Sequence, residues 1–129
     1  MRYALLNLSS PADGQCLVTA ARVANGLVRR GHQIDTVFFS DAATAVGLVS
    51  LSMPQDELCV QSEWQRIAAE HQIDLVLCVA SALQRGVVGP DSPGDAVNLA
   101  SLAEGFRIGG LGELVRATHT ADRVLTFGG

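Results

Sequence analysis

The sequence contains no lysine, since all nine of its basic residues are arginine. This absence excludes a phosphate-binding loop that depends on lysine and any reaction through a lysine Schiff base. Aromatic residues make up only 5% of the chain, and its longest run of bases is the pair Arg29 and Arg30. The sequence therefore predicts no direct binding of nucleic acid, which needs a basic surface interleaved with aromatic rings.

Cysteine is also scarce, with three residues at long spacings, Cys16, Cys59 and Cys78. This spacing fits neither a redox CxxC pair, nor a zinc knuckle, nor the disulfide framework of a secreted protein. The apolar stretch near the amino terminus, Tyr3–Leu8, is too short for a signal peptide or a membrane span. We therefore expect a cytoplasmic protein with no membrane contact.

The 129 residues are 48% hydrophobic and 17% charged, with a formal net charge of −4. This length suits one domain over residues 1–129, and the apolar fraction excludes a disordered chain. Apolar patterns predict strands alternating with helices. The predicted strands are residues 3–8, 33–39, 73–79, 106–108 and 123–127, and the predicted helices are 15–30, 42–52, 56–72, 80–85, 95–104 and 110–119. Such alternation is typical of a three-layer α/β/α domain around a mostly parallel sheet of about five strands.

The reactive side chains divide between the two edges of such a sheet. Cys78 closes the third strand and the other two cysteines fall in the first turns of helices, so all three are expected at the carboxyl edge. The histidines, His32, His71 and His119, follow or end helices and are expected at the opposite edge. This separation argues against a Cys–His dyad and against a mixed Cys/His zinc site. Sulfane sulfur transfer needs a thiol but no neighbouring base, because a thiolate accepts sulfur as a persulfide and hands it to another thiol.

Cys78 has the most favourable setting for this chemistry. It precedes a predicted helix start at Ala80, whose free amides would lower a thiol pKa from about 8.5 toward neutrality. Small neighbours, Ala80, Ser81 and Ala82, leave room for a partner. The alternative is that Cys78 is a small apolar residue filling a buried strand. We interpret Cys16 and Cys59 as inert helix residues.

The glycine-rich segment Gly109–Gly112 follows a strand and opens a helix, where a phosphate could bind. Its spacing is not GxGxxG and no lysine follows, so we prefer tight packing of the helix on the sheet as its reason. A flavodoxin-like nucleotide or flavin binder is the hypothesis that this segment leaves open. The sequence predicts no cofactor and no metal ligand.

Several segments match a known family: residues 78–88 after an apolar strand, 105–114 with its Gly-Leu-Gly, and 121–127. In these segments, and over nearly the whole chain, the protein resembles the DsrE/TusD family of sulfur-relay subunits. The resemblance implies a DsrEFH-like (flavodoxin-like) fold and a sulfurtransferase subunit whose catalytic persulfide cysteine is Cys78.

The resemblance also implies partners. These are DsrF/TusC-like and DsrH/TusB-like subunits in a heterohexamer, a TusA-like sulfur donor and a TusE/DsrC-like acceptor. Transfer would lead toward 2-thiouridine in tRNA, without direct tRNA binding by this chain. DsrE-type transfer in dissimilatory sulfur oxidation and a non-catalytic assembly subunit with a buried Cys78 are the alternatives.

The chain departs from the family pattern in three loops: residues 9–14, the pair Ser40-Asp41 where an aromatic residue is expected, and residues 90–94. These loops are predicted at the same edge as Cys78. We therefore expect them to affect the choice of partner.

Overall fold

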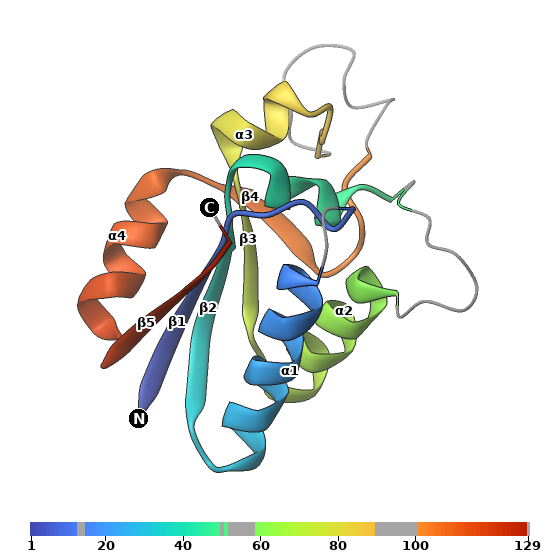
Figure 1. Ribbon diagram of the computed structural model, residues 1–129. Coiled ribbons are helices and arrows are strands. Elements are labelled where there is room, and N and C mark those ends of the chain that lie inside the picture. Colours follow the sequence, from blue (N-terminus) through green and yellow to red (C-terminus); the bar gives the residue numbers. More distant parts are fainter. Residues whose placement is uncertain (13–14, 50, 52–58, 90–100, 129) are drawn as a thin grey trace.

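The computed structural model describes residues 1–12, 15–49, 51, 59–89 and 101–128. Five parallel strands form one sheet in the order β4-β3-β2-β1-β5 (Figure 1). The strands are β1 (Arg2–Asn7), β2 (Gln33–Phe39), β3 (Asp74–Cys78), β4 (Phe106–Gly109) and β5 (Arg123–Phe127). The helices are α1 (Cys16–Arg29), the 3₁₀ helix η1 (Asp41–Gly47), α2 (Val60–His71), α3 (Val79–Gln84) and α4 (Leu111–Thr120). The predicted α/β class with a parallel sheet is confirmed.

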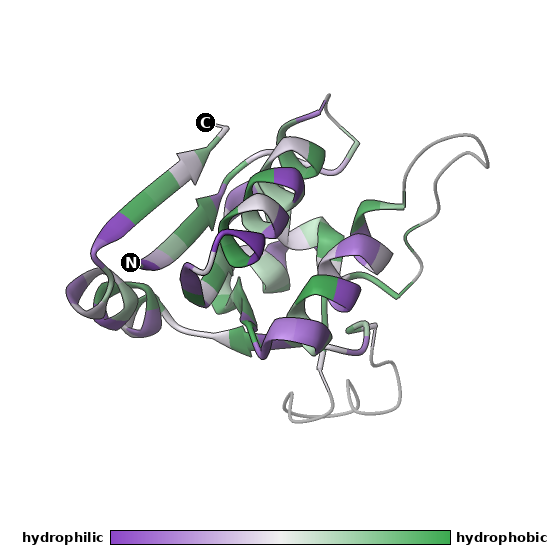
Figure 2. Ribbon diagram, turned by 90° about the horizontal axis from the view of Figure 1, so that it is seen from below, coloured by the Kyte–Doolittle hydropathy of each residue, from purple (hydrophilic) through white to green (hydrophobic). Residues whose placement is uncertain are grey.

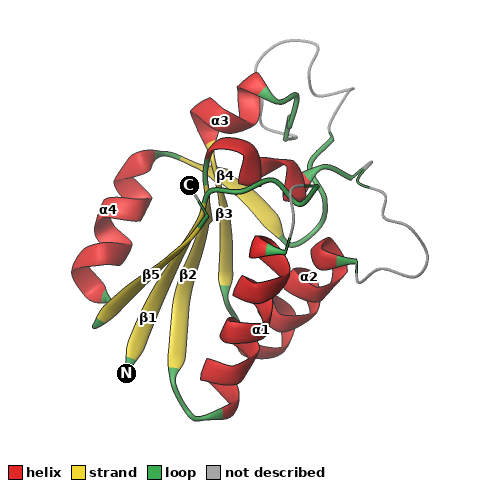
Figure 3. Cartoon of the chain, in the orientation of Figure 1, coloured by secondary structure: helices red, strands yellow, loops and turns green. Residues whose placement is uncertain are grey.

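The helices lie in layers on the two faces of the sheet. Helices α1 and α2 cover one face and α4 covers the other (Figures 1 and 3). Successive strand residues point to opposite faces, so Phe39 joins the large core under α1 and α2, while Phe38 joins a smaller cluster on the side of α4. The predicted three-layer α/β/α arrangement follows from this alternation.

Aromatic packing holds α2 against the sheet. The ring of Phe39 meets Trp64 edge to face at 5.5 Å between centroids and meets Phe106 at 5.9 Å. Trp64 and Phe39 are fully buried. Such contacts add to the stabilisation from apolar burial, and they connect β2, α2 and β4 in one core.

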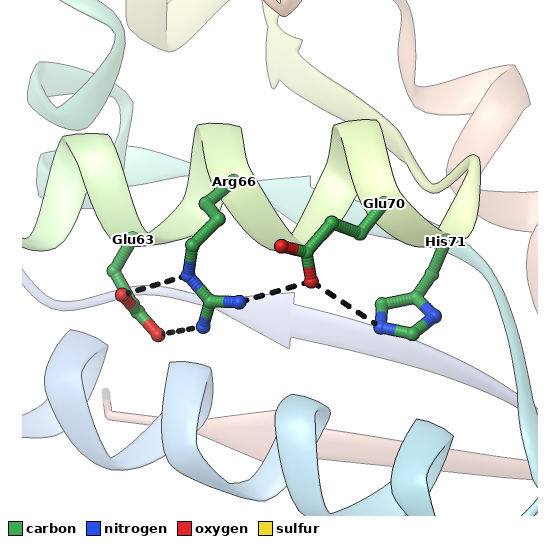
Figure 4. Close-up of polar contacts among 4 residues, drawn as sticks. All are labelled: Glu63, Arg66, Glu70 and His71. Carbon is green, nitrogen blue, oxygen red and sulfur yellow. Dashed lines mark hydrogen bonds and ion pairs between the residues drawn. The ribbon is translucent and has the colours of Figure 1, made fainter.

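The outward face of α2 is polar. Arg66 pairs with Glu63 one turn before it and with Glu70 one turn after it, the latter at 3.0 Å, and His71 lies 3.9 Å from Glu70 (Figure 4). Pairs at these spacings support an exposed helix. Figure 2 shows hydrophilic and hydrophobic residues alternating along the helices, as expected for elements with one face in water. This row of charges is a solvated face and forms no site.

Three predicted helices differ from the structure. In place of the helix predicted over 42–52, the structure has the 3₁₀ helix η1, which ends at Gly47, and Leu48 pairs with Leu102 in an isolated antiparallel bridge. The helix predicted over 56–72 is described from Val60, with Cys59 as its N-cap, and residues 52–58 lie outside the described residues. Of the helix predicted over 95–104, residues 95–100 also lie outside them, and residues 101–104 are not helical. The reason is long-range pairing, because the Val49 N–H donates to the Ser101 carbonyl at 2.6 Å and the Ala103 N–H to the Gly47 carbonyl at 2.7 Å.

Tight packing explains only one glycine of the segment Gly109–Gly112 at the start of α4. A Cβ on Gly109 would overlap the carboxylate of Glu113 and lie 2.8 Å from Val76 Cγ1. A Cβ on Gly110 or Gly112 would meet no atom within 4 Å. The interpretation of the segment as a packing feature therefore holds at Gly109 alone.

We predict that Gly109→Ala lowers the free energy of unfolding by about 1–3 kcal/mol, the usual cost of forcing an extra methyl group into a packed site. Gly112→Ala is the matched control and should leave stability unchanged or slightly raised, because alanine favours a helix. Urea unfolding of both variants measures this difference. Equal stability of the two variants would contradict the prediction, because it would show that an extra methyl group fits at residue 109.

Candidate active site at the carboxyl edge of the sheet

Cys78 lies where β3 ends and α3 begins (Figure 1). It is the N-cap residue of α3 and pairs with Gly109 on the neighbouring strand. Its side chain is only 4% exposed and packs with Phe38 and Val76, beside the partly buried Leu114 of α4. Cys78 therefore stands at the strand end, as predicted, and it also belongs to an apolar cluster, while its role as the persulfide cysteine stays a prediction.

Burial and hydrogen bonding have opposite effects on the pKa of the Cys78 thiol. Burial raises the pKa of the Cys78 thiol, but hydrogen bonds from the backbone and hydroxyl of Ser81, the backbone of Ala80 and the hydroxyl of Ser40 lower it, and the net pKa lies below its usual value. All of these donors are neutral. Hydrogen bonding to the charged form favours ionisation, so the site stabilises a thiolate without a charged partner.

Ser81 links Cys78 to the segment after β2. Its side chain is buried, and its hydroxyl oxygen accepts a hydrogen bond from the backbone N–H of Asp41 at 3.0 Å. Asp41 has a left-handed backbone with φ 50°, and the Thr44 hydroxyl donates to its carbonyl at 2.8 Å. Left-handed backbone in a residue other than glycine is uncommon and often found at functional sites.

Sequence reasoning missed the part played by these serines. It treated Ser81 as a small neighbour that leaves room, and Ser40 as a departure that affects partner choice. No capping-box pattern marks Ser81, because that motif has Ser or Thr at the N-cap and Glu or Gln three residues later, whereas the N-cap here is Cys78. No local pattern connects Ser40, which follows β2, with Cys78, which ends β3.

Cys59 differs from its expected place. It is the N-cap of α2 and its sulfur accepts a hydrogen bond from the Ser62 hydroxyl at 3.3 Å. That hydroxyl, with the backbone N–H groups of Ser62 and Gln61, lowers the pKa of the Cys59 thiol against the effect of burial. Cys59 therefore lies one residue before the first turn of the helix, where the sequence placed it inside that turn, and its interpretation as an inert residue stays a prediction. Cys16 is the first residue of α1, and all three cysteines are free thiols.

The histidines lie at the opposite edge from Cys78, as predicted. His32 precedes β2, where its Nδ1 lies 3.3 Å from the amino terminus and its ring meets Tyr3 edge to face. His71 and His119 lie in the last turns of α2 and α4. Among the described residues, no group of three or more His, Cys, Asp or Glu could hold a metal ion. In the same part of the chain, no helix is long and apolar enough to cross a membrane.

A second polar cluster lies beneath α4 and supports the site. Arg107 of β4 donates to Asp74 at 2.6 and 2.8 Å and to Glu113 of α4 at 3.0 Å. Hydrogen bonds from Arg107 lower the pKa of Glu113 below its usual value. These bonds fix α4 on the sheet, and α4 supplies Leu114 to the cluster around Cys78.

We predict that alkylation of Cys78 by iodoacetamide has a pH midpoint below that of the same cysteine in the unfolded chain, about 8.5. A lowered pKa means that the reactive thiolate persists to lower pH. Because the donors are neutral, added salt should leave the midpoint nearly unchanged. Peptide-resolved mass spectrometry across a pH series measures both effects, and a midpoint at or above the unfolded value would contradict the lowered pKa of Cys78.

The sequence is similar to known proteins over nearly its whole length. The DsrE/DsrF-like family matches residues 1–127. The sulfurtransferase TusD of Photorhabdus laumondii is 37% identical over 129 residues, which cover 98% of each chain. The sulfurtransferase TusD homolog of Pasteurella multocida is 41% identical over 128 residues, covering 97% of this chain and 98% of that one.

Among solved structures, the ychN protein from E. coli superposes with a TM-score of 0.77 at 24% identity, over 98% of this chain and 100% of that one. This likeness concerns the fold. The family match covers residues 1–127, and the relatives above are similar over almost the same length. Together they confirm the family that the sequence resemblance predicted. The chain belongs to the DsrE/DsrF-like family.

Proposed function

We propose that this protein is a sulfurtransferase subunit that carries sulfane sulfur as a persulfide on Cys78. The observation that carries the proposal is a strand-end thiol whose ionised form is stabilised by neutral donors, with the histidines at the other edge. Such a thiol suits transfer between sulfur atoms, in which the attacking group is already a thiolate. Relatives named sulfurtransferase TusD over almost their full length support the same activity.

The reaction has two steps that balance without an oxidant or reductant. In loading, the Cys78 thiolate attacks the outer sulfur of a donor persulfide, a sulfur–sulfur bond forms, and the donor leaves as a thiolate. In delivery, an acceptor thiolate attacks the outer sulfur now held on Cys78, and the electron pair of the broken bond returns to Sγ of Cys78. Each step exchanges one sulfur–sulfur bond for another.

For the destination of the sulfur, we propose TusD-type transfer toward 2-thiouridine of tRNA, with a TusA-like donor and a TusE-like acceptor in the cytoplasm. The relatives cited above carry the TusD name, which favours this route over DsrE-type transfer with a DsrC-like acceptor in sulfur oxidation. The proposed companions are the TusC-like and TusB-like subunits of a heterohexamer. This chain needs no contact with tRNA itself in that scheme.

We predict that protein exposed to a sulfane donor gains one reducible sulfur on Cys78, and that Cys78→Ser abolishes sulfur transfer. Serine has nearly the same size as cysteine but cannot form a persulfide. The measurement is a mass-spectrometric peptide map before and after reduction.

Cys59→Ser is the matched control, because it removes the other thiol with a lowered pKa and should leave transfer intact. A Cys78→Ser variant that still passed sulfur normally would overturn the assignment. Absence of sulfur on every cysteine of the folded protein would favour the non-catalytic assembly subunit instead.

The surface beside the site is suited to partner chains. Val79 and Leu83 are one turn apart on α3 and exposed, and Leu111 and Val115 repeat this spacing on α4. Exposed apolar residues at such spacing often belong to an interface. We predict that the chain expressed alone forms a homo-oligomer or an aggregation-prone product. Light scattering at micromolar concentration measures this, and a clean monomer would contradict it.

A further inference from the structure

Cys78 is too enclosed to meet a second thiol unless a neighbouring element moves. It is 4% exposed and packs with Phe38 and Val76, and Leu114 of α4 packs against this cluster. Sulfur transfer requires another sulfur atom to come within bonding distance of the one that is exchanged. One wall of the cluster therefore has to move.

The walls of the cluster differ in how firmly they are held. β2 and β3, which carry Phe38 and Val76, each pair with a strand on both sides. α3 is held through its buried Ser81, whose hydroxyl oxygen accepts a hydrogen bond from the backbone N–H of Asp41. Of the ten residues of α4, only Ala117 is buried. The least firmly held wall is therefore α4, which lies alone on its face of the sheet in the described part of the chain (Figure 1).

The contact between α4 and the sheet is also incomplete. A pocket of about 120 Å³ opens between them, bounded by Thr36 and Asp74 on the strands and by Arg116 and Thr120 on the helix. This space is polar on most sides and large enough for water. A helix with one buried residue and such a space beneath it gains little from apolar burial. Its position therefore depends on the polar contacts that it makes.

The ion pair of Arg107 and Glu113 supplies such a contact at the end of α4 nearest to Cys78. Arg107 is fixed on β4 by two hydrogen bonds to a carboxylate of β3, and it donates to Glu113 in the first turn of α4 at 3.0 Å. The Glu113 carboxylate occupies the space that a Cβ on Gly109 would take, and Gly109 pairs with Cys78. Leu114 follows Glu113 directly. The ion pair therefore holds the turn of α4 that closes the apolar cluster.

We propose that the Arg107–Glu113 ion pair keeps the first turn of α4 over Cys78, and that release of this turn admits the incoming thiol. Glu113 is then a positioning residue that acts through Leu114. The meaning of this opening for sulfur transfer rests on the proposed function, whereas the access that it gives to the thiol does not. In delivery, the acceptor thiolate bonds to the outer sulfur, and the electron pair of the broken sulfur–sulfur bond stays on Sγ of Cys78.

The test compares Glu113→Gln with the unsubstituted protein. Glutamine keeps the size of the side chain and removes the charge that attracts α4 to Arg107. Alkylation of Cys78 by iodoacetamide is followed by peptide-resolved mass spectrometry, up to the pH at which the rate reaches a plateau. On this plateau the thiolate fraction is constant, so the rate reports access to the sulfur. Circular dichroism checks the fold of each variant.

We expect the plateau rate of Cys78 alkylation to rise roughly threefold in Glu113→Gln, the factor that corresponds to loss of a partly exposed ion pair. Leu114→Ala should raise the rate at least as much, because it removes the apolar wall itself. In the unsubstituted protein, about 1 M salt should raise the rate toward that of Glu113→Gln, because salt screens partly exposed charges. The same salt should have little effect on the variant.

Glu70→Gln is the matched control. It cuts one of the two ion pairs of Arg66 on the outward face of α2 and leaves the other in place, as Glu113→Gln does for Arg107. The alkylation of Cys78 should not change in this control. Equal plateau rates in folded Glu113→Gln and Glu70→Gln would overturn the inference and leave the proposed function standing. An unchanged rate in Leu114→Ala, or in the unsubstituted protein at high salt, would overturn it as well.

A second assay connects access with transfer. Each protein is loaded with glutathione persulfide, and single-turnover delivery to 2-mercaptoethanol is followed. Glu113→Gln should deliver roughly threefold faster, for the same reason as in alkylation. Faster alkylation with unchanged delivery would overturn the role of the opening in transfer. Failure of the unsubstituted protein to take sulfur on Cys78 would instead overturn the proposed function, while the alkylation rates would still decide whether α4 controls access.

Discussion

The burial of β3 between two parallel neighbours is the constraint on which the site depends. β3 pairs with β2 on one side and β4 on the other, so its backbone is held on both sides up to Cys78. Leu75, Val76 and Leu77 are almost completely buried within it. Because the strand cannot shift along its neighbours without exposing these side chains, the sulfur at its end has a fixed position relative to β2 and the loop that follows it.

This position gives the sulfur an environment with two opposing effects. The apolar cluster of Phe38, Val76 and Leu114 removes water, which disfavours a thiolate, while the amides and hydroxyls at the strand end favour it. The balance is struck without a cation. The site therefore combines low water access with stabilisation directed at one atom.

The layer beneath α4 supports this edge in a different way. Only α4 covers its face of the sheet in the described part of the chain, and the core there is small (Figure 1). Arg107 compensates by joining β3, β4 and α4 through Asp74 and Glu113. These groups are partly exposed, and ion pairs of that kind contribute modestly to stability. Their main effect is to position α4, whose Leu114 packs on the apolar side of Cys78. Gly109 has no side chain and so leaves the space that the Glu113 carboxylate occupies.

The sequence by itself determined the alternation of strands and helices, the parallel class of the sheet, the strand that ends at Cys78 and the separation of cysteines from histidines. Each of these follows from local periodicity and from the rule that parallel strands end at one edge. Only the tertiary structure decided the strand order, the non-helical course of residues 101–104, the N-cap position of Cys59 and the serines around Cys78. The hydrogen bond from Asp41 to Ser81 joins residues 40 positions apart. No sequence periodicity encodes such a contact, because it forms only when packing brings two strand ends together.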